Sequence, residues 1–328
     1  MTSLHTSTQT DLEVLILAGG LSHERDVSIR SGRRVADALR SSGMSAHVHD
    51  VDGDLLAYLQ QTRPDVVWPI LHGSTGEDGS VRDVLDLLGV PYVGTDAAGS
   101  RLSWSKPVAK TLLQQAGAST PRFTTLPQTL FRELGTRGVL ERVLDVLGLP
   151  LVVKPASGGS ALGVTVVREA TALPRAMVAC FAYGDEALIE QHIDGVEVAV
   201  SVVDLGDGPQ ALPSVEIVTD GAYDFDARYN PGRSEYFVPG RLTEVQERAA
   251  SDLAVLAHRV LGLRHLSRTD MIVDTDGVAW LLDINVAPGM TETSLFPQAA
   301  EASGYGIEEL YATLVRCAAA QPFHPAAA

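Results

Sequence analysis

Lys154 lies where a short apolar run, residues 151–153, meets the glycine-rich loop 157–163 (SGGSALG). Only three of the 25 lysine and arginine residues in the chain are lysine. A lysine ammonium is a compact charge on a slim stem, whereas an arginine guanidinium is a broad planar fork. A slim cation beside free backbone N–H groups suits a polyphosphate. The position indicates either a phosphate-binding lysine or an exposed lysine before a flexible turn, and the loop alone leaves both open.

Asp283 and Asn285 lie two residues apart at the end of an apolar segment with a strand pattern. Side chains alternate along a strand, so both are expected on one face. Asp270 lies in a second such segment and can supply a third oxygen, and Arg268 shares its face. Oxygen ligands of this kind suit Mg²⁺ held between protein and phosphate, and an arginine is suited to hold an anion. A single Asp in a strand is more often a solvated edge residue, but the set predicts a metal site.

Two polar loops follow apolar runs in the first third of the chain. Residues 19–28 (GGLSHERDVS) contain Glu24, and residues 72–79 (HGSTGEDG) begin with His72. Ligands of open α/β sheets bind at the carboxyl ends of strands, so these loops predict a substrate site. The first loop lacks G-x-G-x-x-G, which disfavours a nicotinamide cofactor. The alternatives are a satisfied strand-end histidine at His72 and helix-capping residues in the first loop.

Short apolar runs alternate with helical patterns from residue 11 onward, which is typical of parallel-sheet units. We expect an α/β and α+β protein whose N-terminal domain holds a Rossmann-like parallel sheet. The expected organisation is a disordered tail at 1–10 and three domains at 11–95, 96–191 and 192–328. The expected elements of the first domain are strands at 13–18, 46–50 and 65–71 and helices at 27–42 and 80–89.

The remaining two domains are expected to mix strands and helices. The middle one has expected helices at 102–116 and 173–181 and strands at 122–126, 151–154, 164–167 and 187–191. The last has expected strands at 196–205, 211–218, 267–273 and 278–284 and helices at 244–261 and from 307. The loop 220–232 is long for a connection without secondary structure, and such loops are usually functional lids or disordered.

Composition excludes several classes of partner. The chain has 328 residues and a formal net charge of −16, which argues against nucleic acid, whose affinity for proteins comes mainly from phosphate neutralisation. Two cysteines are too few for a disulfide framework and fit a reducing compartment. No apolar stretch approaches the roughly 18 residues of a membrane span, and the first ten residues lack a signal-peptide pattern. We therefore expect a cytoplasmic protein without nucleic-acid or membrane partners.

Five motifs occur in one order along nearly the whole chain, from about residue 11 to residue 320. They are residues 19–28 (GGLSHERDVS), 72–79 (HGSTGEDG), 92–94 (YVG), 153–163 (VKPASGGSALG) and 285–291 (NVAPGMT). Together these motifs resemble the D-alanine–D-alanine ligases, a family of the ATP-grasp superfamily. The resemblance implies the ATP-grasp fold.

The resemblance also implies how ATP and metal are bound. Lys106 and Lys154 would contact the phosphates, Glu190 would lie at the adenine hinge and Glu197 at the ribose hydroxyls. The implied ATP site comprises Lys106, Lys154, Ser157, Gly159, Glu190, Glu197 and Arg228. Asp270, Asp283 and Asn285 would hold two Mg²⁺ ions, with Mn²⁺ as an alternative.

The implied amino-acid sites use other residues. Glu24 would hold the ammonium of the first amino acid, hydrogen-bonded with Ser160 and Tyr229, and His72 would contact substrate. Arg268 and the Gly289 backbone N–H would stabilise the acyl phosphate and the tetrahedral species. Ser294 and the Leu295 backbone would bind the carboxylate of the second amino acid.

The implied activity is ATP-dependent joining of two D-alanines for peptidoglycan, through an acyl phosphate. Phosphoryl transfer depends mostly on positioning and charge stabilisation, which explains cations and acids without a nucleophile. Because water destroys an acyl phosphate, the site must close, and the loops 157–163 and 220–232 are the candidate lids. The resemblance further implies a homodimer.

Three positions depart from the family pattern. Asp283 replaces the usual glutamate, Arg228 replaces the lysine before Tyr229, and Ala161 replaces a serine. No required charge is removed, but fine specificity stays open. Three alternatives stay open: a depsipeptide or D-Ala-D-Ser ligase, an ATP-grasp ligase for other amino acids, and an inactive nucleotide-binding module. Tyr229 disfavours D-lactate as the second substrate, because ligases that accept D-lactate lack this tyrosine.

Overall fold

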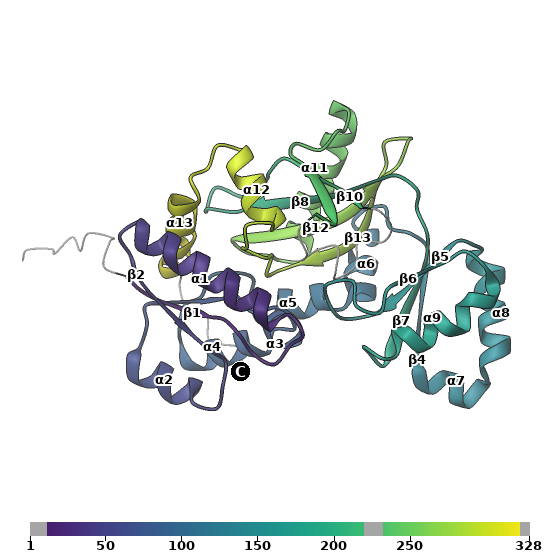
Figure 1. The fold of residues 1–328 in the computed structure, drawn as a ribbon, viewed down its shortest axis with the longest axis horizontal. Helices are drawn as coiled ribbons and strands as arrows, with labels where there is room; N and C mark the ends of the chain where they lie inside the picture. The colour runs from purple at the N-terminus through teal and green to yellow at the C-terminus, as the bar shows by residue number, and fades with distance from the viewer. Residues whose placement is uncertain (1–11, 220–231, 322–328) are drawn as a thin grey trace, which may run out of the picture.

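The structure of the protein, a computed structural model, describes residues 12–219 and 232–321. The expected tail at 1–10 and nearly all of the loop 220–232 lie outside these residues. Three sheets with flanking helices lie along one long axis, with the N-terminal sheet at one end and the central sheet at the other (Figure 1). None of the described helices is long and apolar enough to cross a membrane.

The N-terminal sheet is parallel, as the sequence predicts. Its order is β2 (Ser45–His49), β1 (Glu13–Leu17), β3 (Val66–Pro69). Its helices are α1 (Arg25–Ser41), α2 (Leu55–Thr62), α3 (Ser74–Glu77) and α4 (Ser80–Leu88). A strand covered on both faces is apolar along its length, and Val14 to Leu17 are all buried. Because β1 and β3 are neighbours, the loops after them meet at one sheet edge, which brings Glu24 and His72 together.

The central sheet is antiparallel and carries the glycine-rich loop. Its order is β4 (Phe123–Pro127), β7 (Glu186–Gln191), β5 (Leu151–Pro155), β6 (Thr165–Val167). Its helices are α7 (Gln128–Leu134), α8 (Thr136–Leu147), the 3₁₀ turn η1 (Ala170–Ala172) and α9 (Leu173–Cys180). The loop 157–163 connects the paired strands β5 and β6, so its position is set by both ends of the hairpin.

The third sheet lies between the other two and is antiparallel. Its order is β11 (Ser234–Phe237), β10 (Val215–Thr219), β8 (Val196–Val203), β12 (Leu266–Val273), β13 (Ala279–Asn285), with β9 (Gln210–Ala211) beside β8. Its helices are α11 (Glu244–Val260), α12 (Leu295–Ala302) and α13 (Ile307–Ala320). A capping box formed by Thr243 and Gln246 begins α11 and satisfies two backbone N–H groups.

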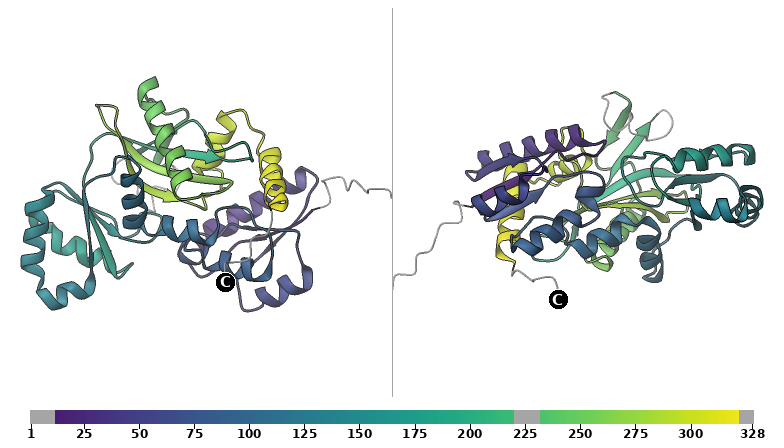
Figure 2. Two further views of the ribbon diagram at one scale, coloured as in Figure 1. Left: turned by 180° about the vertical axis from the view of Figure 1, so that it is seen from behind. Right: turned by 90° about the horizontal axis from the view of Figure 1, so that it is seen from below.

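The C-terminal helix α13 packs beside α1, at the far end of the sequence from it (Figures 1 and 2). Tyr311 of α13 makes an edge-on contact with Trp68 of β3, with ring centroids 5.3 Å apart. One hydrophobic core therefore contains buried residues of both the first and the last predicted domains. The domain boundaries expected after residues 95 and 191 remain predictions.

The expected helix at 102–116 is wrong as one element. The structure has α5 (Ala97–Trp104) and α6 (Lys106–Gln115), separated at Ser105, whose backbone is extended (φ −84°, ψ 95°). Pro107 is the cause, because a proline ring clashes with the preceding helical turn and is tolerated only at a helix start. The interruption gives Lys106 the first position of a new helix.

The expected strand at 211–218 is also interrupted, between β9 and β10. Pro213 lies in the gap and has no N–H to donate to a ladder, which confines proline to edges and breaks of sheets. The other expected strands and helices are present with shifted ends.

Candidate functional site

A cavity of about 660 Å³ lies between the central sheet and the third sheet. It is lined on one side by the glycine-rich loop and β5, and on the other by β12 and β13. The predicted ATP-site residues that line it are Lys106, Lys154, Gly159, Glu190 and Glu197. Ser157 lies in the same loop, half-buried, and does not line the cavity. Arg228 lies outside the described residues.

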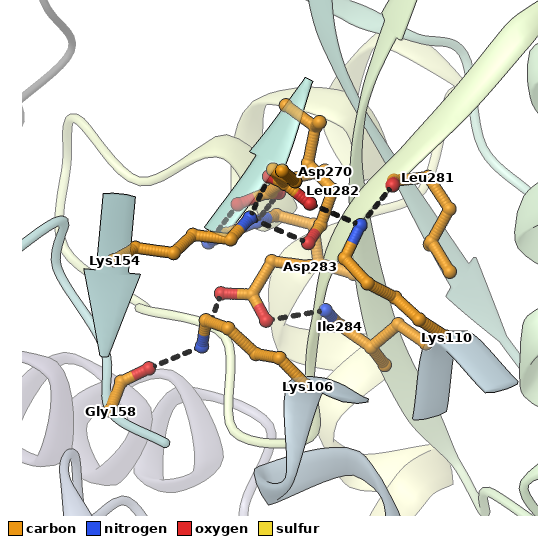
Figure 3. A network of polar contacts seen from close by, with 11 residues as sticks. Lys106, Lys110, Lys154, Gly158, Asp270, Leu281, Leu282, Asp283 and Ile284 are labelled. Atoms are coloured by element: carbon orange, nitrogen blue, oxygen red, sulfur yellow. Dashed lines mark hydrogen bonds and ion pairs between the residues drawn. The ribbon is translucent and has the colours of Figure 1, made fainter. Parts of the chain in front are cut away.

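Two ion pairs hold the predicted phosphate-binding lysines, a buried one at Lys154 and a partly exposed one at Lys106. Lys154 Nζ is 2.5 Å from Glu190 Oε1. Lys106 Nζ is 3.0 Å from Asp283 Oδ2 and donates to the Gly158 carbonyl at 2.6 Å (Figure 3). Burial alone would raise the pKa of Glu190, but the ammonium groups of Lys110 and Lys154 outweigh it and lower that pKa. Glu190 is thus held as a carboxylate.

The predicted metal ligands lie on two paired strands. Asp270 of β12 is opposite Asp283 of β13, and Arg268 is opposite Asn285. Arg268 donates two hydrogen bonds to the Asp270 carboxylate, at 2.6 and 2.8 Å. The Asn285 amide oxygen accepts a hydrogen bond from the Ala287 N–H at 2.8 Å. The register therefore brings together the four residues whose spacing pointed to this site.

The donor set fits a hard cation. Asp270 and Asp283 both line the cavity and offer carboxylate oxygens, and Asn285 adds an amide oxygen on the same strand. No group of three or more His, Cys, Asp and Glu that could hold a metal occurs within residues 12–219 and 232–321. An amide oxygen as third ligand is consistent with that, and oxygen-only donors are those that Mg²⁺ prefers.

A second, smaller cavity shares Gly159 with the first. The other predicted residues in its lining are Glu24, His72, Ser160, Arg268, Asn285, Gly289, Ser294 and Leu295. Ser160 donates a hydrogen bond to Glu24 across 136 residues of sequence. Ser160 and Ala161 have left-handed backbone (φ 49° and 55°), which is unfavourable for side-chain-bearing residues and is concentrated at functional sites. Tyr229, the expected third member of this set, lies outside the described residues.

Two buried groups beside Glu24 have perturbed pKa values. Burial lowers the pKa of His72, although Glu24 opposes the effect, so this imidazole is neutral. Its Nε2 has no hydrogen-bond partner in the part of the chain that the structure describes. Burial, and secondly Glu24, raise the pKa of Glu77 to about 8. Its Oε1 accepts the Gly73 N–H at 3.0 Å.

Glycine at position 289 is required by a close approach. A Cβ there would lie 2.7 Å from Ser294 Oγ. That hydroxyl accepts the Thr291 N–H at 2.9 Å, and Ser294 immediately precedes α12. The unpaired N–H groups of a first helical turn, which here begins at Leu295, attract a carboxylate.

Sequence reasoning missed two residues of the site, Glu77 and Lys110. Glu77 is buried and lies within the 72–79 motif, where an acid beside glycines resembles an exposed loop residue. Lys110 is the third lysine of the chain, one turn after Lys106, and its rarity was the available signal.

The arrangement combines a large cavity, whose lining includes two lysines and two aspartates, with a small polar cavity whose lining includes Glu24, the neutral His72 and Arg268. Such a pair of cavities can transfer a phosphoryl group from a nucleotide to a small substrate.

Comparison with known proteins supports that chemistry. The family model for the D-ala D-ala ligase C-terminus matches residues 112–316, and the model for the N-terminus matches residues 52–95. The chain is 39% identical to a D-alanine–D-alanine ligase of Gloeobacter violaceus, covering 93% of this chain and 98% of that one. It is 40% identical to the ligase of Desulforudis audaxviator, covering 92% and 97%.

Solved structures give the same result. The D-alanine–D-alanine ligase from Bacillus anthracis superposes with a TM-score of 0.81 at 28% identity, covering 94% of this chain and 97% of that one. A structure of the Bacillus anthracis ligase complexed with ATP gives a TM-score of 0.78 at 27% identity, with the same coverage. The fold is therefore the ATP-grasp fold.

Proposed function

This chain belongs to the D-alanine–D-alanine ligase family, and from that membership we propose that it joins two D-alanines into D-alanyl-D-alanine for peptidoglycan, converting ATP to ADP and phosphate. The observation that carries the proposal is the pair of adjoining cavities, one with Lys106, Lys154 and paired aspartates, the other with Glu24, Ser160 and Arg268. The first cavity, of about 660 Å³, has room for a nucleotide, and the second is lined by charged and polar side chains that suit small zwitterions.

In the first step, a carboxylate oxygen of one D-alanine attacks the γ-phosphorus of ATP. The bond between that phosphorus and the β–γ bridging oxygen breaks, and ADP leaves. Lys106 and Lys154 neutralise the phosphate oxygens, since both ammonium groups line the cavity. Glu24, oriented by the Ser160 hydroxyl, binds the ammonium of this first D-alanine. His72 offers its unpartnered Nε2 to the same substrate.

In the second step, the amine of the other D-alanine attacks the acyl-phosphate carbonyl, and phosphate leaves. The ammonium loses one proton before the attack and a second as the amide forms, and phosphate and water take them up. Arg268 and the Gly289 N–H stabilise the negative charge that develops on the carbonyl oxygen. Ser294 and the first turn of α12 hold the carboxylate of the second D-alanine.

The proposal includes a metal, an assembly and a compartment. Asp270, Asp283 and Asn285 are the residues that would hold Mg²⁺, which would supply charge neutralisation at the ATP phosphates. Glu190 and Glu197 line the part of the cavity that we assign to adenine and ribose. From the family resemblance, we also propose that the protein is a homodimer and acts in the cytoplasm.

Phosphate release across D-alanine, D-serine, D-lactate and L-alanine, alone and in pairs, tests the function. We expect robust ATP-dependent release with D-alanine alone, with D-alanyl-D-alanine as the product identified by mass spectrometry. Release that requires D-serine or D-lactate as the second substrate would replace the proposal with one of the alternative ligases. No release with any substrate would leave only nucleotide binding.

The Asp283→Glu variant is expected to release phosphate at the wild-type rate or faster. Glutamate restores the longer carboxylate usual in the family, and the cavity beside Asp283 has room for one more methylene. The measurement is phosphate release as a function of Mg²⁺ concentration. Asp276→Glu makes the same extension at an exposed turn and serves as the control. A folded Asp283→Glu enzyme without activity would mean that the site is built around the shorter acid.

A further inference from the structure

Lys110 is a fully buried lysine that the proposed function does not use. It lies on α6 one turn after Lys106 and is 1% exposed. Its ammonium is 2.9 Å from Glu190 Oε2 and donates to Thr120 Oγ1 and to the Leu281 carbonyl, both at 2.8 Å. Unlike Lys106 and Lys154, it does not line the 660 Å³ cavity. The buried Lys110 ammonium therefore connects three separate parts of the chain through these three oxygen atoms.

The first of those parts is β7 with Glu190. The Glu190 carboxylate is shared, with Oε1 held by Lys154 at 2.5 Å and Oε2 by Lys110. Glu190 is 1% exposed, and a buried carboxylate with only one partner is costly. Because Lys110 holds Oε2 of Glu190, it fixes the orientation of Oε1. Oε1 in turn fixes the position of the Lys154 ammonium, which lines the cavity.

The second part is an irregularity in β13. The register pairs Asp270 with Asp283 and Met271 with Leu281, so Leu282 has no partner on β12. Bulges of this kind redirect the side chains beside them. The Leu281 carbonyl accepts from Lys110, and the Leu282 carbonyl accepts from Lys154 at 3.2 Å (Figure 3). The two lysines therefore bind consecutive carbonyls directly before Asp283.

We propose that Lys110 is a positioning residue of the nucleotide site, which sets the place of Lys154 through Glu190 and the place of Asp283 through the β13 irregularity. This inference rests on the proposed function for its site and adds a residue that touches neither ATP nor D-alanine. It predicts that losing Lys110 weakens ATP binding, while the D-alanine cavity, lined by other residues, keeps its affinity.

The chemistry of the position explains why it is lysine in a chain that otherwise uses arginine. An ammonium has three donors around one nitrogen, and here three oxygens lie within 2.9 Å of it: two hydrogen-bond acceptors and the paired Glu190 carboxylate oxygen. A planar guanidinium has a fixed fork that is broader than this space. Lys110→Arg is therefore expected to lose nearly as much ATP affinity as Lys110→Met.

The test compares Lys110→Met and Lys110→Arg with wild type. We expect the dissociation constant for ATP, measured by calorimetry, and the KM for ATP to rise at least about tenfold. The KM for D-alanine is expected to stay within about twofold of wild type. Arg137→Met removes the cation of an exposed α8 ion pair with Glu141 and is the matched control, expected to change neither constant.

A double-mutant cycle separates positioning from general destabilisation. In Lys110→Met the Glu190 charge is left with Lys154 alone, so adding Glu190→Gln is expected to cost less ATP affinity than the same change in wild type. Additive losses, or equal losses of affinity for ATP and D-alanine, would overturn the proposal. So would an unchanged dissociation constant for ATP in Lys110→Met.

If Lys110→Met does not fold, Thr120→Val removes one of the three acceptors and leaves both charges in place. It is expected to show the same pattern in milder form, and unchanged ATP affinity there would overturn the proposal. ATP titration needs no turnover. Failure of wild type to release phosphate with D-alanine would therefore reject the proposed function without deciding the role of Lys110.

Discussion

The Lys154→Ala variant is expected to lose ATP-dependent phosphate release with D-alanine by roughly a hundred- to a thousandfold. Its ammonium lines the nucleotide cavity, and it is one of only two cations that we place at the ATP phosphates. The change also removes the 2.5 Å partner of Glu190, so that this buried carboxylate keeps only Lys110. The measurement is phosphate release at saturating D-alanine over a wide range of ATP concentrations.

Arg142→Ala is the control for Lys154→Ala. It removes a cation from the surface of α8, where the guanidinium is 3.8 Å from Asp145 and largely exposed, and such pairs contribute little. Its turnover should equal that of wild type. Circular dichroism checks that Lys154→Ala is folded. Near-normal turnover by the folded variant would remove the assignment of this cavity to ATP.

Much of this cavity could be predicted because local patterns determine it. Strand alternation places Asp283 and Asn285 on one face, and Asp270 is confirmed on the neighbouring strand, opposite Asp283. The loops with Glu24 and His72 are likewise expected at the carboxyl ends of strands, and β1 and β3 are neighbours in the sheet, which brings the two loops to one edge. In each case the site residue lies in the strand that positions it or directly after that strand, so a short stretch of sequence is enough to predict its place.

The partners of buried charges could not be predicted in the same way. Glu190 has a strand pattern around it, but Lys110 on α6 is 80 residues away in sequence and Lys154 on β5 is 36 residues away. Choosing a partner for a buried carboxylate requires knowing which elements cross in space, which periodicity does not encode. The same holds for Glu77, whose burial beside Glu24 depends on how two loops pack.

The helix wrongly predicted over 102–116 contains Lys106 and Lys110. The apolar spacing over 102–116 fits a single helix, but Pro107 interrupts it at Ser105. Lys106 and Lys110 lie one turn apart on α6, the first beside Asp283 and the second beside Glu190. Proline chemistry takes precedence over periodicity here, and it makes Lys106 the first residue of a helix.

The Arg268→Met variant is expected to lower kcat by about a thousandfold, and Arg268→Lys by roughly a hundredfold. Arg268 lines the small cavity, where we place the carbonyl oxygen on which negative charge develops. Lysine keeps the charge but cannot make the two parallel hydrogen bonds to Asp270, at 2.6 and 2.8 Å, that fix the guanidinium. The measurement is kcat and the KM for ATP, which is expected to change little because Lys106 and Lys154 remain.

Arg241→Lys is the matched control, because Arg241 also makes a two-bond contact with an acid, donating to the Glu216 carboxylate at 2.9 and 2.6 Å. That pair lies outside both cavities, so its loss should affect stability slightly and kcat not at all. If Arg268→Lys lowers kcat no more than Arg241→Lys does, the two hydrogen bonds to Asp270 are not needed for turnover and Arg268 acts through its charge alone. An ordering of wild type, lysine and then methionine would instead mean that both its charge and its geometry act on the reaction.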